Sequence, residues 1–210
     1  MATHFTLSDD QRDCLQEVIN VAIGRAGDAL ARFLEVFVRL SVPHIQILEA
    51  RELPKLIQSS QRAVENVSAV RQGFTGISRP AMRGEAVAIY SDASFHELAK
   101  LLGHKEETDG DISEAELLCD VSNILVGNCL GNIARQFNGE VVFSAPSPLL
   151  LQRSLHELTD QLSAEWDAAL LVEIHYSLER GTFRCTLVLL MPTDVMVQLG
   201  AMIDTMLDAL

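Results

Sequence analysis

The chain has 210 residues, 48% of them hydrophobic, and a formal net charge of -13. That length and hydrophobic content allow a substantial core, so the chain should fold without disulfides. The negative charge disfavours nucleic acids and anionic membranes as partners. No basic segment followed by an apolar run opens the sequence, and no uninterrupted apolar stretch approaches the roughly eighteen residues of a membrane span. We therefore expect a cytoplasmic protein with neither a membrane span nor a nucleic acid partner.

The first half is expected to begin with a long helix. Ser8 to Gln11 has the pattern of a capping box, and the apolar periodicity continues to about Phe33. Pro43, which cannot donate a ladder hydrogen bond, indicates an edge or a bulge in the extended run that follows. The remaining predicted elements of this half are a strand at 36–42 continued at 45–48, a short helix at 52–58, strands near 63–74 and 83–91, and a helix at 93–102.

The second half repeats this order after a charged seam at 104–111. Another capping box, Ser113 to Glu116, opens a second long helix. It is followed by an extended run at 140–151, a helix from Ser154, strands near 168–178 and 182–191, and a closing helix from Asp194. Hairpin-linked strands without regular crossover helices predict an α+β fold with two layers, long helices and a mainly antiparallel sheet.

We expect residues 1–210 to form a single domain built from two repeats, at about 8–103 and 113–210, related by a pseudo-twofold axis. Four residues near the start of the chain support this duplication. Asp13, Glu17, Asn20 and Pro43 are separated by three, two and twenty-two residues. Each has a counterpart 103 positions later, namely Glu116, Asp120, Asn123 and Pro146. A spacing kept over the whole interval predicts two equivalent polar sites.

The polar residues of each copy should face outward. At about 100° per residue, positions 13, 17, 20 and 24 fall in a stripe roughly 60° wide. Positions 116, 120, 123 and 127 form the same stripe in the second helix. Glycine occupies both 24 and 127, which fits the close approach of another molecule's backbone. The apolar residues of the first helix centre on the opposite side: Leu15, Val18, Ile19, Ala22, Ala26, Ala29, Leu30 and Phe33.

The two motif copies resemble the CheC/CheX/FliY phosphatases of bacterial chemotaxis. The resemblance rests on Glu-Val-Ile-Asn-Val-Ala-Ile-Gly at 17–24, Asp-Val-Ser-Asn-Ile-Leu-Val-Gly at 120–127, and a Ser-x-Pro at 41–43 and again at 144–146. Two copies in one chain look like CheC more than the shorter, single-copy CheX. The second copy departs from the family pattern at Glu116, where Asp or Ser is usual, and at Asp120, where Glu is usual.

The resemblance implies hydrolysis of the aspartyl phosphate on a CheY-like response regulator. In that family the Asn orients the attacking water, and the acidic residue pairs with the receiver's lysine. Carried over, these catalytic roles fall on Asn20 with Glu17 and on Asn123 with Asp120. The resemblance places Mg²⁺ on the partner receiver, and it also allows a CheD-type deamidase as a partner. Because Asp120 is one methylene shorter than Glu17, we expect Asn20 to carry more of the activity than Asn123.

No cofactor or metal is expected in this chain itself, because the six histidines and four cysteines show no metal-ligand spacing and no CxxC pair. Plainer interpretations of the motif also stand. The stripes can be solvated helix surface, Glu116 can serve only the capping box, and Pro43 and Pro146 can shape the strand beside the helix. Two other functions stay open: a non-catalytic docking or adaptor protein of the chemotaxis or flagellar-switch apparatus, and a structural protein.

Overall fold

The computed structural model describes residues 6–41, 43–55, 66–76, 82–101, 113–166, 168–178 and 181–209. The first half contains α1 (Asp9–Leu34), β1 (Val38–Leu40), β2 (His44–Glu49), the 3-10 helix η1 (Ala50–Glu52), β3 (Asn66–Gly76), β4 (Arg83–Ser91) and α3 (Asp92–Leu101). The second half contains α4 (Glu114–Gln136), β5 (Val141–Phe143), β6 (Ser147–Ser154), α5 (Leu155–Glu165), β7 (Ala168–Leu178), β8 (Gly181–Met191) and α6 (Thr193–Leu207).

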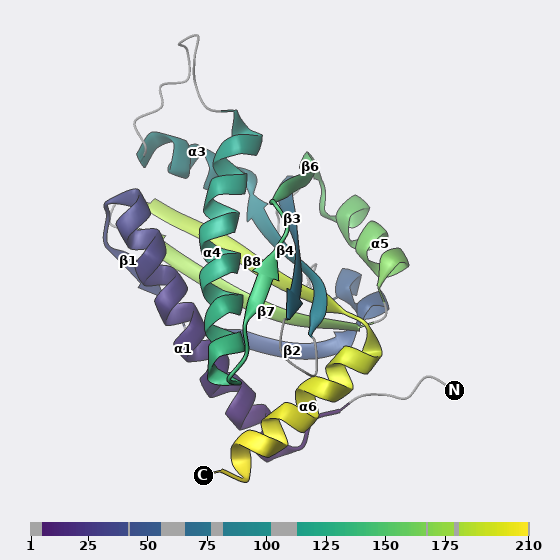
Figure 1. Ribbon diagram of the computed structural model, residues 1–210. Helices are drawn as coiled ribbons and strands as arrows, with labels where there is room; N and C mark the ends of the chain where they lie inside the picture. The colour runs from purple at the N-terminus through teal and green to yellow at the C-terminus, as the bar shows by residue number, and fades with distance from the viewer. Residues whose placement is uncertain are drawn as a thin grey trace.

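One eight-stranded sheet forms the centre of the molecule (Figure 1). Its strand order is β1-β7-β8-β4-β3-β5, with β2 also paired to β7 and β6 to β3. Every pairing is antiparallel. The short strands of each half pair with a long strand of the other half, so neither half completes its sheet alone. The predicted α+β class with a mainly antiparallel sheet is confirmed; the division into repeats of one domain stays a prediction.

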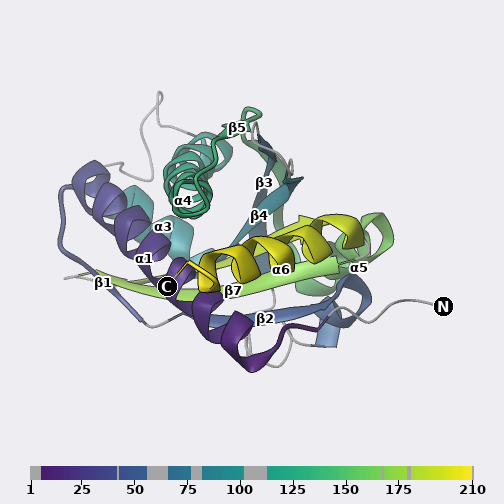
Figure 2. The same cartoon turned by 60° about the horizontal axis from the view of Figure 1, so that its bottom comes forward.

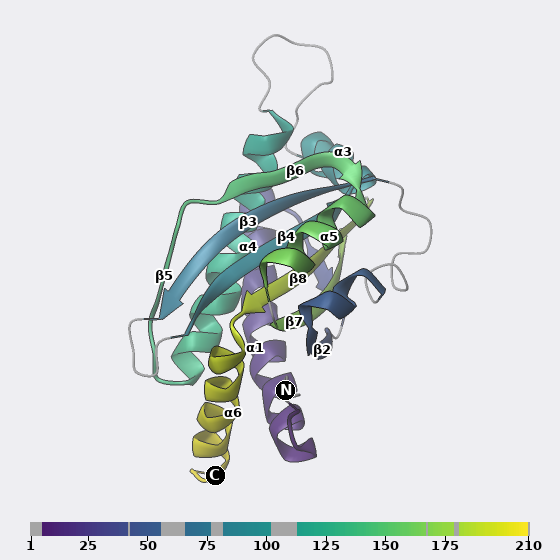
Figure 3. The same ribbon diagram turned by 90° about the vertical axis from the view of Figure 1, so that its right-hand side faces the viewer.

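Helices cover both faces of the sheet. Because side chains alternate across a strand, Ala86, Ala88 and Tyr90 of β4 join the larger core beneath α1, α4 and α6. Val87 and Ile89 point the other way, into a smaller core with α5 and η1. Figures 2 and 3 show α5 on the opposite side of the sheet from α1 and α4. The small layer of α5 and η1 therefore adds to the two layers expected from the sequence.

The two long helices lie side by side on the larger face (Figures 1 and 2). Gln136 at the end of α4 donates a 2.9 Å hydrogen bond to the carbonyl oxygen of Val18 on α1. The buried Gly27 lets Leu40 of β1 pack directly on α1, where a Cβ atom would lie 2.6 Å from the Leu40 side chain. This packing fixes the rotation of α1, and with it the direction in which its polar stripe faces.

The capping predictions are confirmed. Ser8, Ser113 and Ser154 each accept a hydrogen bond from the third residue of the helix that follows. The strands and helices match the predicted ranges to within a few residues, although the helix expected at 52–58 can be followed only to residue 55 and the seam at 104–111 lies outside the described residues. Phe33, assigned to the apolar side of the first helix, is 37% exposed. It lies in the last turn of α1, next to the buried Leu34.

Candidate functional site

The polar stripe of α1 faces solvent as predicted. Asp13 and Glu17 are exposed, and Asn20, one turn further on, is half-buried. Leu15 and Ile19, on the other side of the same turns, are at most 2% exposed. The sheet holds the apolar side of the helix, so the stripe has only one direction to face.

The stripe of α4 has the same orientation relative to the sheet. Asp120 and Asn123 are exposed, while Val121 and Leu125 are buried beneath them. A depression of about 500 Å³ lies beside Asp120 and is lined by Ala115, Glu116, Cys119, Asp120 and Pro148. The helices that carry the two stripes, α1 and α4, cover the same face of the sheet (Figure 1).

Glu17 and Asp120, the carboxylates nearest the two asparagines, have no partner among the described residues. Among the described residues, neither Glu17 nor Asp120 takes part in a hydrogen bond or an ion pair. An exposed carboxylate without a partner keeps its negative charge available for a cation on another molecule. Both therefore suit a contact with a lysine, at a reach that differs by one methylene.

Asn20 is held by a neighbour on its own helix. The Nε2 group of Gln16 donates to Asn20 Oδ1 at 3.1 Å and to the carbonyl oxygen of Pro43 at 3.1 Å. Pro43 is buried immediately before β2, so its carbonyl is a fixed acceptor. The side-chain oxygen of Asn20 thus points toward the protein, and no described residue accepts a hydrogen bond from its Nδ2.

Asn123 is held in the same way by a residue from a different element. The Nε2 group of Gln72, on β3, donates to Asn123 Oδ1 at 3.0 Å and to the carbonyl oxygen of Ser144 at 3.0 Å. Ser144 is itself fixed, because its Oγ accepts from the backbone N–H of Gly73 at 2.9 Å. Neither Gln16 nor Gln72 was expected at the site from the sequence. The signal available for Gln16 was its position four residues before Asn20, which allows an i,i+4 contact.

Glu116, the first acidic residue of the second motif copy, has a structural role. Glu116 Oε2 accepts hydrogen bonds from the backbone N–H of Ser113 at 2.9 Å and from its Oγ at 3.0 Å. These bonds lower the pKa of Glu116 below that of an ordinary glutamate. The capping interpretation of Glu116 is confirmed, and the equivalent Asp13 is exposed with no hydrogen bond or ion pair among the described residues.

The two motif glycines leave open space on the stripes. A Cβ atom added at Gly24 or Gly127 would meet nothing within 4 Å. Packing inside this chain therefore does not require glycine at either position, although glycine costs about 1 kcal/mol in a helix relative to alanine. The observation agrees with the prediction that these positions serve an approaching partner.

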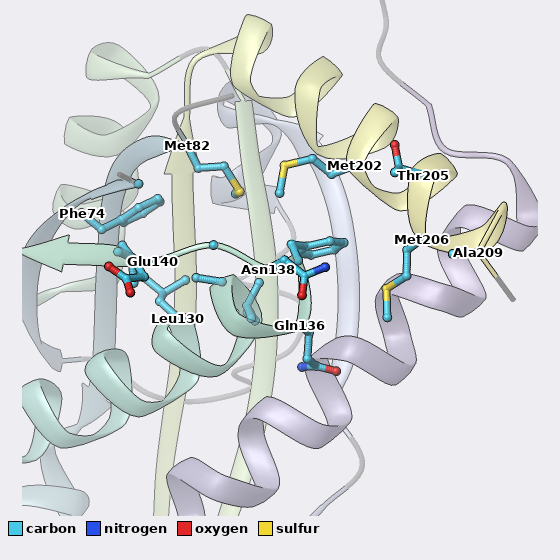
Figure 4. A pocket seen from close by; sticks show the side chains of 16 residues that line it. Phe74, Met82, Leu130, Gln136, Asn138, Glu140, Met202, Thr205, Met206 and Ala209 are labelled. Atoms are coloured by element: carbon cyan, nitrogen blue, oxygen red, sulfur yellow. The ribbon is translucent and has the colours of Figure 1, made fainter. Parts of the chain in front are cut away.

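Another pocket lies away from the stripes, at the C-terminal end of α4. It has a volume of about 680 Å³, and none of the motif residues lines it. Figure 4 shows Met82, Met202 and Phe74 around this mostly apolar space, with Glu140 near it. The pocket brings no pair of catalytic groups together, so it does not compete with the stripes as a candidate active site.

The cysteines remain thiols in the structure. All four are free, with Cys14 and Cys119 half-buried and Cys129 and Cys185 fully buried. Burial raises the pKa of Cys129 to about 12, and burial does the same for Cys185. In the part of the chain that the structure describes, no group of three His, Cys, Asp or Glu residues is arranged to hold a metal ion.

One helix has the length and hydropathy of a membrane span. It is α4, and 56% of its most apolar window is buried inside the protein. A core helix of a soluble protein passes the same test. It packs against α1 and β3.

Comparison with known proteins shows which proteins share this fold. No protein-family model matches the chain. The flagellar motor switch phosphatase FliY of Bacillus subtilis (strain 168) is 22% identical over 177 residues, which are 83% of this chain and 44% of that protein. The crystal structure of FliY from Thermotoga maritima matches with a TM-score of 0.67 at 14% identity, over 96% of this chain and 99% of the other. The middle domain of FliM from H. pylori gives a TM-score of 0.57 at 10% identity, over 93% and 99%.

The fold and the two helix stripes define an α+β protein that presents two outward pairs of a carboxylate and an amide. This is the arrangement on which the sequence resemblance rested. The curated match and the T. maritima structure are both FliY proteins, so the predicted resemblance to the CheC/CheX/FliY family is confirmed. The chain spans less than half the length of the curated relative that it matches. The closer likeness to two-site CheC stays a prediction.

Proposed function

We propose that this protein hydrolyses the aspartyl phosphate of a CheY-like response regulator. One observation carries the proposal. On each long helix, an asparagine has its side-chain oxygen engaged inside the protein, no described acceptor for its Nδ2, and an exposed carboxylate without a partner one turn before it. The curated relative, named as a flagellar motor switch phosphatase, supports the same reaction class.

Asn20 and Asn123 are the residues proposed to orient the attacking water. Phosphoryl transfer needs positioning and charge stabilisation more than covalent help from the enzyme. The two N–H groups of a neutral amide donate, and its oxygen has a second lone pair that accepts a water hydrogen. A water held in this way has its own lone pair free to attack phosphorus in line with the departing aspartyl oxygen. The aspartate leaves as a carboxylate, and the protons of the water remain on the phosphate or pass to solvent.

Glu17 and Asp120 are proposed to bind the lysine of the receiver's active site. Such a contact would align the helix on the receiver and hold the lysine beside the phosphoryl group. Gly24 and Gly127 would let the receiver's backbone approach the same helix face. The Mg²⁺ ion of the reaction would be held by the receiver, and it would neutralise charge on the phosphoryl oxygens. We place the protein in the cytoplasm for this reason, since its proposed substrate is a cytoplasmic signalling protein.

The test is the rate of phosphate loss from a phosphorylated receiver. Asn20→Ala and Asn123→Ala should each lower the rate, and the double variant should lower it by about 10²-fold or more, as when a transition-state hydrogen-bond donor is removed. Asn20→Ala should have the larger effect because Glu17 has the longer reach. Asp160→Ala, an exposed position on α5 across the sheet, is the control and should leave the rate unchanged.

The result of this assay separates the proposals. If the double variant hydrolyses the phosphoprotein as fast as the unaltered protein, the stripes are not active sites. Equal losses in the two single variants would contradict only the ranking.

A docking or adaptor role is the second candidate. The same fold occurs in the middle domain of FliM, a protein whose solved structures include a complex with FliG. A receiver or a CheD-type deamidase bound at the stripes would fit this role. Binding of a phosphorylated receiver without faster phosphate loss would select it over catalysis. Equal affinity for the phosphorylated and the unphosphorylated receiver would argue against both a phosphatase and a phosphate-dependent adaptor.

A further inference from the structure

The two candidate sites hold their asparagines by the same hydrogen-bond chain, built from different parts of the sequence. In each, one glutamine Nε2 donates both to an asparagine Oδ1 and to a backbone carbonyl of the Ser-x-Pro segment. Gln16 does so within α1 at 3.1 and 3.1 Å, and Gln72 does so from β3 at 3.0 and 3.0 Å. We call these two arrangements the glutamine bridges.

The backbone carbonyl fixes the orientation of the glutamine and asparagine side-chain amides in each bridge. A peptide oxygen can only accept, so the glutamine must turn its NH₂ group toward it and not its oxygen. The second N–H of that NH₂ group then faces the asparagine, which must turn its own oxygen to receive it. The asparagine NH₂ is thereby directed away from the bridge. A fixed peptide oxygen thus sets the orientation of an exposed side chain two hydrogen bonds away.

The second bridge is retained at a cost to stability. Gln72 is 2% exposed, and its Oε1 is buried with no hydrogen-bond partner. An unsatisfied buried acceptor destabilises a fold, because its hydrogen bond to water is lost without replacement. An apolar side chain of similar size would avoid this cost, so packing alone does not account for a glutamine there. Since Gln72 is almost fully covered, direct contact with another protein does not account for it either.

The two sites take their glutamine from positions that are not equivalent. The helix position equivalent to Gln16, at the constant offset of 103, is Cys119. On the strands, Phe74 pairs with Phe143, and Tyr176 pairs with Leu40, the counterpart of Phe143. Two residues earlier, Gln72 therefore matches Ile174 in register. Each site has a single glutamine for this role, supplied by the helix at the first site and by the strand at the second.

We propose that Gln16 and Gln72 are positioning residues that fix the catalytic amides of Asn20 and Asn123. This inference rests on the proposed phosphatase function and adds residues that the family motif does not contain. With the bridge in place, the amide presents its NH₂ group outward before the receiver docks. Without it, three staggered χ1 wells and two amide orientations give about six arrangements, of which one is productive.

The effect on catalysis is measured with one site at a time. In the Asn20→Ala protein the remaining activity reports on the second site, and Gln72→Leu in that background should lower kcat by about sixfold. The KM for phosphorylated receiver should stay the same, because Gln72 is buried and the docking stripe is unchanged. Gln161→Leu, on α5 across the sheet, is the matched control and should change neither constant.

Relocating the glutamine tests the role against a general loss of structure. The depression of about 500 Å³ beside Cys119 leaves room for a longer side chain. Cys119→Gln places a glutamine four residues before Asn123, as Gln16 stands before Asn20. In the Gln72→Leu protein this change should restore most of the lost kcat. Gln16→Leu in the Asn123→Ala background should produce the equivalent loss at the first site.

A measurement independent of activity examines the bridge itself. Both N–H groups of Gln72 are engaged and buried, so its side-chain amide protons should exchange slowly with solvent in NMR spectra. The signals are assigned by their disappearance in Gln72→Leu. Fast exchange would overturn the bridge.

The kinetic outcomes separate this inference from the proposed function. If the unaltered protein does not accelerate phosphate loss, the proposed function fails, and the catalytic role of the bridge fails with it. If it does, but Gln72→Leu leaves kcat unchanged, only the positioning role is refuted. A loss that Cys119→Gln does not restore, with a lowered melting temperature, would show that Gln72 acts on folding alone.

Discussion

Replacing Asp120 by glutamate tests whether the second site is limited by the reach of its carboxylate. Asp120 is exposed, has no hydrogen bond or ion pair among the described residues, and borders a depression with room for an extra methylene. The substitution therefore adds length without displacing a neighbour. It gives the second site the same acidic residue as the first.

The expected gain follows from the distance to the receiver's lysine. One carbon–carbon bond adds about 1.5 Å of reach, so a pair held at about 4.5 Å by aspartate would close to about 3 Å. With an effective dielectric constant of about 40 to 80, the Coulomb energies of those pairs differ by about 0.5 to 0.9 kcal/mol. We therefore expect kcat/KM at the second site to rise about two- to fivefold.

The assay is phosphate release from a phosphorylated receiver by Asn20→Ala protein with and without Asp120→Glu. The reverse change, Glu17→Asp in the Asn123→Ala protein, should lower kcat/KM at the first site by a similar factor. Both differences should shrink as salt rises, because exposed ion pairs are screened. If lengthening Asp120 and shortening Glu17 both leave the rate unchanged, neither carboxylate contacts a cation in the reaction, and the assigned role is wrong.

Three further predictions concern the helices and the cysteines. Ser113→Ala should destabilise the fold by about 1 kcal/mol through loss of the cap. Because the folded-state pKa of Glu116 is lowered, the contribution of Glu116 to the cap is present at neutral pH and is lost as the pH falls through that pKa. The difference in melting temperature between the unaltered protein and Ser113→Ala should therefore narrow in acid. Gly24→Ala should raise the melting temperature, because alanine gains up to about 1 kcal/mol of helix propensity and its Cβ atom meets nothing within 4 Å. The same change should slow phosphate release, because the receiver's backbone is proposed to approach the helix there. Faster release would contradict that contact. In native protein at pH 8, a thiol reagent should modify Cys14 and Cys119 well before Cys129 and Cys185. Burial raises the pKa of each of the latter two thiols to about 12, so few of them are thiolates. Equal rates of modification would show that Cys129 and Cys185 are not buried.

The candidate site could be located from the sequence because its parts are local. Glu17 and Asn20 share a helix face by spacing alone, and the buried Leu15 and Ile19 fix which side faces the sheet. The helix ends were predictable for the same reason, since Ser8 and Ser113 cap residues only three positions away. A pattern that spans one or two turns of helix carries its own geometry.

The glutamine at the second site was not predictable in this way. Gln72 lies 51 residues before Asn123, and the contact exists only because β6 and β5 of one half pair with β3 of the other. No periodicity in the sequence encodes that exchange of strands.

The separate construction of the two bridges has a consequence for how the sites depend on each other. The first bridge uses α1 and Pro43, whereas the second uses α4, β3 and Ser144, and the two have no residue in common. Substitutions at one bridge therefore have no direct hydrogen-bond path to the other. Energetic effects of residues that share no partners usually add. Losses measured at the two sites should accordingly combine as independent terms, even though α1 and α4 pack against each other on the same face of the sheet.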